Sequence, residues 1–200
     1  MTDDRLYAPA ALRNRGPILD VLRAVLPDAG VVLEIASGSG EHVVYFAAHW
    51  PALIFQPTDP DPGAVRSIAA WVDAAGVANV RPPLLLDAAA PQWPVSVADA
   101  IVCINMIHIS PWAAAEGLLR RAGAMLSAGA PLYLYGPFRR HVAPWAESNE
   151  AFDHDLRARN PAWGVRQLET VADLAAAHGF GPPHIVEMPA NNLSVIFRRV

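Results

Sequence analysis

Apolar residues recur along the chain in two patterns, and each pattern predicts one kind of element. In long segments they fall at helical spacing, and these segments are predicted to be helices: 8–26, 41–50, 62–75, 111–126 and 168–178. Short apolar runs between them are predicted to be strands: 31–35, 53–56, 80–86, 100–105, 131–135, 184–187 and 193–198. Gly16-Pro17 is expected to interrupt and restart the first helix, and Gly76 is expected to end the third.

The order of these elements predicts an α/β fold. Alternating strands and helices indicate a mostly parallel sheet covered by helices on both faces. The run 100–105 is almost continuously apolar, as is typical of a strand buried on both faces. Only residues 188–192 join the last two strands, so these two are expected to pair antiparallel. We expect one Rossmann-like domain over residues 1–200, with a seven-stranded, mostly parallel sheet, an antiparallel last strand and a partly helical lid insertion around 136–165.

Length and composition narrow the functional classes. A chain of 200 residues of which 53% are hydrophobic can bury a sizeable core. Its net charge of -4 does not favour nucleic acid or an anionic membrane as partner, which leaves a small-molecule substrate. Residues 1–5 lack the apolar core of a secretory signal, and no apolar run approaches the roughly 20 residues that span a bilayer. The single Cys103 cannot form an internal disulfide. These features predict a soluble, cytoplasmic protein and leave monomer or homodimer undecided.

Three carboxylates come at the ends of predicted strands, where open α/β sheets bind their ligands: Glu34, Asp59 and Asp87. The small residues 36–40 form a tight turn that a ligand can approach closely. Asp59 stands where an acid can bind two ribose hydroxyls, and Asp87 where one can bind an adenine amino group. Either acid taken alone could instead cap a helix or lie in a solvated loop. In series they favour an adenosine pocket.

The glycine pattern distinguishes between two adenosine cofactors. The NAD fingerprint G-x-G-x-x-G needs a third glycine beside the pyrophosphate, whereas Gly38-x-Gly40 is followed here by Glu41, whose carboxylate would repel phosphate. The spacing Glu34-x-Ala36-x-Gly38-x-Gly40 instead resembles the first motif of class I S-adenosylmethionine-dependent methyltransferases, E/D-x-G-x-G-x-G, with Ala36 in place of the first glycine.

Longer motifs resemble a single family. They are Arg13-Asn14 with Pro17-Ile18-Leu19, and the segments 34–42, 56–59, 103–112, 135–138 and 188–193. Together they are similar to the DUF938 family, a methyltransferase-like family of largely unassigned substrate that includes the methyltransferase-like 26 relatives. The resemblance covers the chain from about Tyr7 onward, and Ala36 is usual for that family. It implies a class I methyltransferase fold and S-adenosylmethionine as cofactor.

By matching positions, the resemblance also implies a cofactor site. The turn 36–40 would face the methionine part, Asp59 the ribose and Asp87 the adenine. Arg13 or Asn14 could meet the methionine carboxylate, although Arg13 could equally be a solvated helix residue. The complete predicted set is Arg13, Asn14, Glu34, Ala36, Ser37, Gly38, Gly40, His42, Asp59, Pro60, Asp87, Ala88, Asn105 and Met106.

Methyl transfer from a sulfonium mainly requires that nucleophile and methyl group be held in line and that water be excluded. A general base is needed only if the acceptor is protonated. His108 is the best candidate base and Tyr135 the second, although His108 could only shape the pocket and Tyr135 could only be a packed aromatic.

Several residues are expected to line the acceptor pocket: Trp112, Phe138, Asn149, Trp163, Asn191 and Asn192. The pair Asn191-Asn192 could equally form a hairpin turn, because Asn tolerates left-handed backbone angles. Arg139-Arg140 could attract an anionic acceptor or be a solvated surface.

Two functional hypotheses remain. One is an enzyme that methylates a small, polar or anionic molecule, and the other is a non-catalytic protein that binds S-adenosylmethionine or a related adenosine ligand on the same fold. The strand-end carboxylates and the aromatic-rich insertion favour the enzyme. The histidines show no metal-ligand spacing, so no metal is expected, and neither G-x-S-x-G nor a P-loop occurs.

Overall fold

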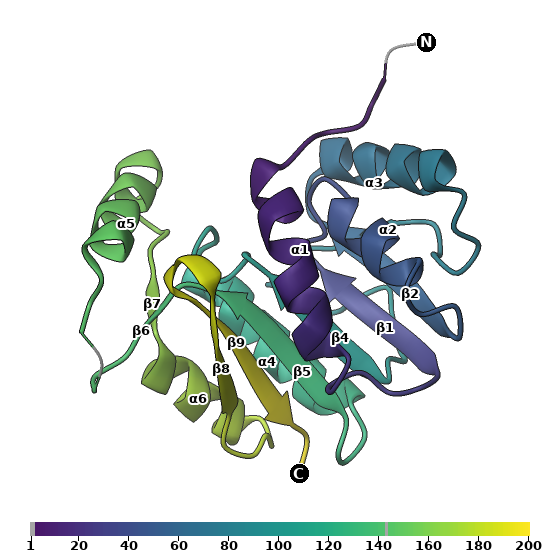
Figure 1. Cartoon of the computed structure of the whole chain (residues 1–200). Helices are drawn as coiled ribbons and strands as arrows, with labels where there is room; N and C mark the ends of the chain where they lie inside the picture. Colours follow the sequence, from purple (N-terminus) through teal and green to yellow (C-terminus); the bar gives the residue numbers. More distant parts are fainter. Residues whose placement is uncertain (1–2, 143) are drawn as a thin grey trace.

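The computed structural model describes residues 3–142 and 144–200, and its centre is one seven-stranded sheet (Figure 1). The strand order is β3-β2-β1-β4-β5-β9-β8, and every neighbouring pair is parallel except the two that involve β9. The strands are β1 Gly30–Ile35, β2 Leu53–Asp59, β3 Leu84–Leu85, β4 Ala100–Ile104, β5 Pro131–Gly136, β8 His184–Met188 and β9 Asn192–Arg198. The predicted fold class is therefore confirmed, including the antiparallel last strand.

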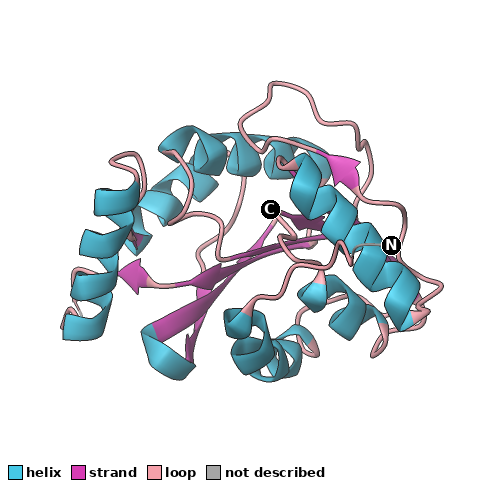
Figure 2. Cartoon of the chain, turned by 90° about the horizontal axis from the view of Figure 1, so that it is seen from above, coloured by secondary structure: helices cyan, strands magenta, loops and turns pink. Residues whose placement is uncertain are grey.

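Helices cover both faces of this sheet, as Figure 2 shows from above. One face packs against α1 (Pro9–Leu22), α2 (Glu41–Ala47) and α3 (Pro62–Ala75), and the other against α4 (Trp112–Met125) and α6 (Leu168–Ala177). The central strand β4 is buried along its whole length, which explains its continuous apolar sequence. Gly76 ends α3 in a left-handed conformation, as its sequence predicts.

The segment between β5 and α6 forms a separate layer at one side of the molecule (Figure 1). It contains α5 (Glu147–Arg159) and a two-stranded parallel ribbon of β6 (Phe138–Arg139) and β7 (Arg166–Gln167). A short 3-10 turn, Pro189–Asn191, joins β8 to β9. No helix among the described residues is both long enough and apolar enough to cross a membrane.

The first helix runs without interruption through Gly16-Pro17, so the predicted restart is wrong. Pro17 lacks the N–H that would bond to the Arg13 carbonyl, and its ring disfavours a helical conformation of the preceding residue, Gly16. Gly16 relieves the second effect because it has no Cβ. Burial of Ile18 and its helical neighbours against the sheet contributes about 1.5–3 kcal/mol per side chain, which offsets a defect of about 3 kcal/mol.

The third predicted strand is much shorter than expected, because Pro82 and Pro83 offer no N–H to a ladder. Only an isolated bridge between Phe55 and Val80 and the two residues of β3 pair with β2. The Gln56 side chain closes the gap between them by donating to the carbonyls of Pro57 and Pro82, at 3.1 and 3.0 Å. The strand β2 continues past Pro57 to Asp59, further than its predicted end, since the missing N–H faces this interrupted side.

Candidate functional site

The turn after β1 lies at the point where the strand order reverses, between β1 and β4. Ala36, Gly38 and Gly40 have positive φ angles of 57°, 59° and 95°. A Cβ on Gly40 would lie 2.8 Å from the Cα of Ile68, so only glycine fits there. Apart from its two chain neighbours, no described residue has an atom within 4 Å of the Cβ position at Gly38, which leaves this side of the turn open to a ligand.

Asp59 holds this turn from the end of β2. Its side chain is 7% exposed, and its two oxygens accept the N–H groups of Gly38 at 2.9 Å and Asp61 at 3.0 Å. Burial raises the pKa of this carboxyl, while the two N–H groups oppose the rise. Ser37 extends the same link because its N–H donates to the Thr58 carbonyl at 2.8 Å. Asp59, the residue predicted to bind the ribose, is therefore fixed against the glycine turn, and Pro60 next to it is exposed.

Glu34 is a buried carboxyl with one free oxygen. Its side chain is 3% exposed, and among the described residues its Oε2 has no hydrogen-bond partner. Burial raises its pKa to about 7, and the nearby charge of Asp59 adds to this effect. An unpartnered buried carboxyl is costly unless a donor or a cation reaches it, so this position suits the positive end of a ligand.

Asn14, His42 and Tyr135 meet on the face of the sheet that α1 and α2 cover. The Nε2 of His42 lies 2.8 Å from the Oδ1 of Asn14, and the imidazole stacks on Phe46. Burial lowers the pKa of His42 to about 4, so the ring is neutral at pH 7. Burial raises the pKa of Tyr135, with the Asn14 side chain opposing the rise, so its hydroxyl keeps its proton. Arg13 points to the exposed side of α1 and forms no hydrogen bond or ion pair within residues 3–142 and 144–200.

The next two strand ends complete the edge of the sheet. Asp87 is exposed, and its Oδ1 accepts the N–H of Ala89 at 2.9 Å, which matches the alternative that it shapes a loop. Ala88 beside it is buried. Asn105 follows β4 in a left-handed conformation with φ 59°, and its N–H donates to the Tyr135 carbonyl at 2.8 Å. Buried Met106 follows it.

His108 is enclosed beside these strand ends. Its side chain is 5% exposed, and a Cβ on Gly136 would lie 3.0 Å from its Nδ1. The ring of Phe152 on α5 meets it edge-on, with centroids 5.7 Å apart. Burial and then the charge of Arg166 lower the pKa of His108 to about 4. Neither ring nitrogen is hydrogen-bonded to another described residue, so a neutral imidazole keeps its proton-accepting nitrogen free.

Three of the predicted acceptor residues line one pocket of about 80 Å³ between α5 and the turn after β8: Phe138, Asn149 and Asn191. The Asn149 side chain donates to the Asn191 carbonyl at 3.1 Å. Asn191 has a φ of 55°, and the Asn192 side chain donates to carbonyls of the same turn, so the turn interpretation of this pair is confirmed. Arg140 also lines the pocket, but an ion pair of 2.7 Å joins it to Glu187.

Trp112 and Trp163 do not line this pocket, and an arginine side chain lies over each of their rings. Arg166 lies over Trp112 at 5.8 Å and Arg159 over Trp163 at 5.3 Å. Arg166 also donates to the carbonyls of Ile107, Ser110 and Ala162 at 3.3, 2.8 and 2.7 Å. It therefore fastens the insertion to the loop that carries His108, a role that its position in the sequence gave no reason to expect.

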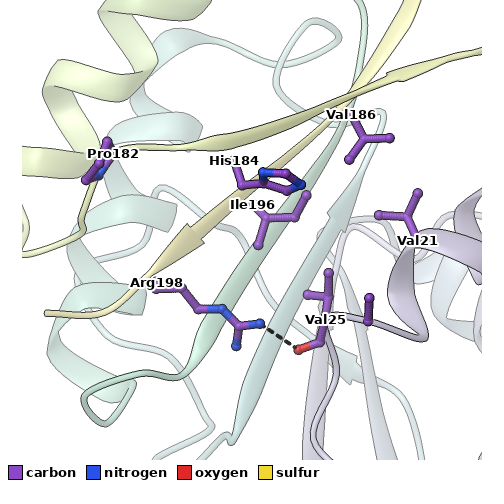
Figure 3. Close-up of a pocket in the computed structure, with 8 residues that line it drawn as sticks. Val21, Val25, Pro182, His184, Val186, Ile196 and Arg198 are labelled. Atoms are coloured by element: carbon purple, nitrogen blue, oxygen red, sulfur yellow. Dashed lines mark hydrogen bonds between the residues drawn. The ribbon is translucent and has the colours of Figure 1, made fainter.

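A larger pocket of about 340 Å³ contains none of the predicted site residues (Figure 3). Val21 of α1, Val25 just after this helix, and residues of β8 and the end of β9 line it, including His184 and Arg198. Since β9 is antiparallel, this pocket lies at the opposite end of the sheet from the glycine turn. The chemistry that the sequence predicts is thus not in this larger pocket.

Sequence reasoning also missed three residues that surround the turn. Glu41 is 2% exposed and directs its carboxylate to the N–H of Ala8, and Ser67 and Trp71 of α3 contact the same N-terminal segment. In the sequence, Glu41 stands out only as a charge after Gly40. No sequence pattern could have paired it with a residue 33 positions earlier.

Comparisons with known proteins assign the chain to a family and show which solved structures share its fold. The family model described as "Protein of unknown function (DUF938)" matches residues 5–199. Solved methyltransferases have the same fold. Mitomycin 7-O-methyltransferase MmcR has a TM-score of 0.80 at 17% identity, over 96% of this chain and 54% of that one.

Two further structures agree. Human N-acetylserotonin methyltransferase in complex with S-adenosylmethionine has a TM-score of 0.78 at 13% identity, over 95% of this chain and 52% of its own. An O-methyltransferase family 2 protein from Planctomyces limnophilus in complex with apigenin has a TM-score of 0.76 at 17% identity, over 96% and 60%. The chain thus spans little more than half the length of these proteins.

Proposed function

We propose, because this chain belongs to the DUF938 family and has the fold of S-adenosylmethionine-dependent methyltransferases, that it transfers a methyl group from S-adenosylmethionine to a small-molecule acceptor. One observation carries the proposal: the open glycine turn at the reversal of strand order is fixed by Asp59 and lies beside the free carboxyl of Glu34. Solved structures of proteins with the same fold, one in complex with S-adenosylmethionine and one with apigenin, support it.

The described residues fit this cofactor in charge and shape. The unpartnered Oε2 of Glu34 suits an ammonium group, and the carboxylate of Asp59 suits a pair of ribose hydroxyls. Open space at Gly38 allows close approach to the backbone. In the proposal the remaining cofactor contacts come from the residues that the resemblance implies: Asn14, Ala36, Ser37, Gly40, His42, Pro60, Asp87, Ala88, Asn105 and Met106, with exposed Arg13 at the rim.

S-adenosylmethionine supplies, when bound, an electrophilic methyl group on a sulfonium. The chain's own contribution is to hold the acceptor in line, to exclude water and to remove a proton where the acceptor carries one. Neutral His108 can accept that proton. Burial raises the pKa of Tyr135, so in this proposal its protonated hydroxyl donates a hydrogen bond and His108 acts as the base. In this proposal Phe138 and Asn149 of the insertion and Asn191 of the turn after β8 line the acceptor side, and the insertion acts as a lid.

Thermal unfolding with added ligand tests the cofactor. S-adenosylmethionine and S-adenosylhomocysteine should each raise the melting temperature, whereas NAD should not. At a hundredfold excess over Kd, either sulfur ligand should add about 2.7 kcal/mol to the free energy of unfolding. Asp59→Ala should abolish the shift, and Asp73→Ala, an exposed acid on α3, should leave it unchanged. Absence of a shift with either sulfur ligand, far above micromolar concentration, would exclude the proposed cofactor.

A non-catalytic binder would give the same shifts, so turnover needs its own test. A screen for methyl transfer from labelled S-adenosylmethionine to pools of small molecules should reveal a product with the wild-type protein. His108→Gln should reduce that product without changing the Kd for S-adenosylhomocysteine, because His108 belongs to the acceptor side. Binding without any product would favour the non-catalytic hypothesis.

A further inference from the structure

The segment Leu6–Ala8, here called the N-terminal strap, lies against α2 and α3 before the chain enters α1 (Figure 1). Three hydrogen bonds hold its backbone. The Ala8 N–H donates to Glu41 Oε2 at 2.6 Å, the Leu6 N–H donates to Ser67 Oγ at 2.8 Å, and Trp71 Nε1 donates to the Leu6 carbonyl at 2.8 Å. The strap is thus anchored at both of its ends.

Two of these anchors also bind the glycine turn. The Ser67 hydroxyl donates to the Ser39 carbonyl at 2.6 Å, and the Ser39 hydroxyl donates to Glu41 Oε2 at 2.9 Å. Ser67 is fully buried and Glu41 is 2% exposed. A single Glu41 oxygen therefore accepts from the strap and from the turn, and a single Ser67 hydroxyl joins the same two segments.

The outer side of the strap is covered by aromatic contacts. Tyr7 meets Trp71 edge-on with ring centroids 5.3 Å apart, and the Arg5 guanidinium lies 5.2 Å from the Trp71 ring. Trp71 is only partly buried, so its N–H bond to Leu6 and these ring contacts hold the strap from the solvent side.

We propose that the strap holds the glycine turn in its cofactor-binding conformation, and that Glu41 and Ser67 are the positioning residues that transmit this effect. The inference rests on the proposed function for the identity of the ligand. None of these residues needs to touch the cofactor, since each acts through the backbone and side chain of Ser39.

The turn needs such support because its backbone is unusual. Ala36, Gly38 and Gly40 all have left-handed φ angles, and the two glycines gain much freedom if the turn is released. A ligand that binds only one conformation loses affinity in proportion to the fraction of molecules that leave it. Holding the turn in advance therefore raises affinity without adding a contact.

Calorimetric titration with S-adenosylhomocysteine tests this. Ser67→Ala removes the hydrogen bonds of the Ser67 hydroxyl to Leu6 in the strap and to Ser39 in the turn, and it should raise Kd about tenfold. Trp71→Phe keeps an aromatic ring but loses the N–H, and it should raise Kd about fivefold. Trp50→Phe is the matched control and should leave Kd within twofold, because Trp50 lies beyond the C-terminal end of α2, whereas Glu41 begins this helix. Glu41→Leu should weaken binding, whereas Glu41→Gln, which keeps an acceptor oxygen, should restore most of it.

Amide hydrogen exchange of the ligand-free protein gives a second readout. Residues 36–42 should exchange faster in Ser67→Ala and Trp71→Phe than in the wild type or Trp50→Phe, while β4 stays protected. Unchanged exchange in this turn, or a wild-type Kd in both variants, would overturn the inference. If the wild type does not bind S-adenosylhomocysteine, the proposed function fails, and faster exchange would still support the positioning of the turn by the strap.

Discussion

At the scale of single residues, burial shifts three titratable side chains at the carboxyl edge of the sheet towards their neutral forms. It raises the pKa of Glu34 to about 7 and lowers those of His42 and His108 to about 4. A charged group loses hydration when it is buried, and in the described part of the chain the charges that act on these three groups have the same sign as their own ionised forms. Rising pH should therefore lower the stability of the folded protein through Glu34, and falling pH should lower it through the two histidines.

Glu34→Gln should become more stable relative to the wild type as the pH rises from about 4.5 to about 7. In this window the unfolded carboxyl has lost its proton while the folded one keeps it, so the folded wild type loses stability with rising pH. The difference in the free energy of unfolding should grow by about 3 kcal/mol. Urea unfolding at several pH values measures it, with Glu116→Gln, exposed on α4, as control. A difference that does not vary with pH would contradict the raised pKa.

His108→Gln should show the opposite trend. The unfolded imidazole gains a proton below about pH 6.5 and the folded one only near 4, so the folded wild type loses stability as the pH falls through this range. The variant lacks this loss, and its stability relative to the wild type should increase towards acid by about 3 kcal/mol. The same urea series, with exposed His184→Gln as control, checks the sign.

At the scale of elements, the insertion with α5 is fastened at two places. Asn149 and Asn191 bind α5 to the turn after β8, and Arg166 binds the other end to the loop of His108. The Gly164 N–H adds a bond of 3.0 Å to the His108 carbonyl. Hydrogen bonds therefore join the insertion to the loop of the candidate base, as the proposed lid over an acceptor would require.

Arg166→Ala should release this link. The change leaves three carbonyls without their donor and uncovers Trp112, and we expect a loss of about 1–3 kcal/mol of stability. Amide exchange across α5 should accelerate, while β1 and β4 remain protected. Arg159→Ala, whose guanidinium lies over Trp163 and forms an exposed ion pair of 3.7 Å with Asp155, should change stability by less than about 0.5 kcal/mol. Equal effects of the two changes would argue against the fastening role.

Sequence patterns predicted most elements because each pattern depends on local physics. The continuous apolarity of β4 and the glycine stop of α3 express burial and backbone freedom, which neighbouring residues determine. The predictions failed where proline was judged in isolation. Pro17 does not break α1, because tertiary burial of Ile18 outweighs the local defect, whereas Pro82 shortens a strand, because an edge ladder has no such compensation.

At the scale of the whole molecule, two glycines of α4 allow this helix to pack closely against neighbouring segments of backbone. A Cβ on Gly117 would lie 2.0 Å from the Ala88 carbonyl oxygen, and one on Gly123 would lie 2.2 Å from the His178 carbonyl oxygen. The first contact joins α4 to the proposed adenine loop, and the second joins it to the end of α6. Both contacts are with backbone, which cannot move aside by a change of rotamer.

Gly117→Ala and Gly123→Ala should each destabilise the protein by about 1–3 kcal/mol. Only Gly117→Ala should also raise the Kd for S-adenosylhomocysteine, because only its neighbour lies in the site. Glu116→Ala on the exposed side of α4 is the control for both and should change neither quantity much. Stability comes from denaturant unfolding and Kd from calorimetry. A Kd that changes equally in both glycine variants would exclude Ala88 from the cofactor pocket.

The sequence by itself determined the fold class, the order of elements and the strand ends at which the candidate residues gather. It could do so because apolar period, glycine stops and strand-end carboxylates are local features, and parallel strands bring their carboxyl ends to one edge. Tertiary structure alone decided which side chains are partnered. Only the fold shows that Asn14 meets His42, that Glu34 keeps a free oxygen, and that Glu41 turns to a strap far away in the chain. Such pairings depend on distances through space, and spacing along the chain does not encode them.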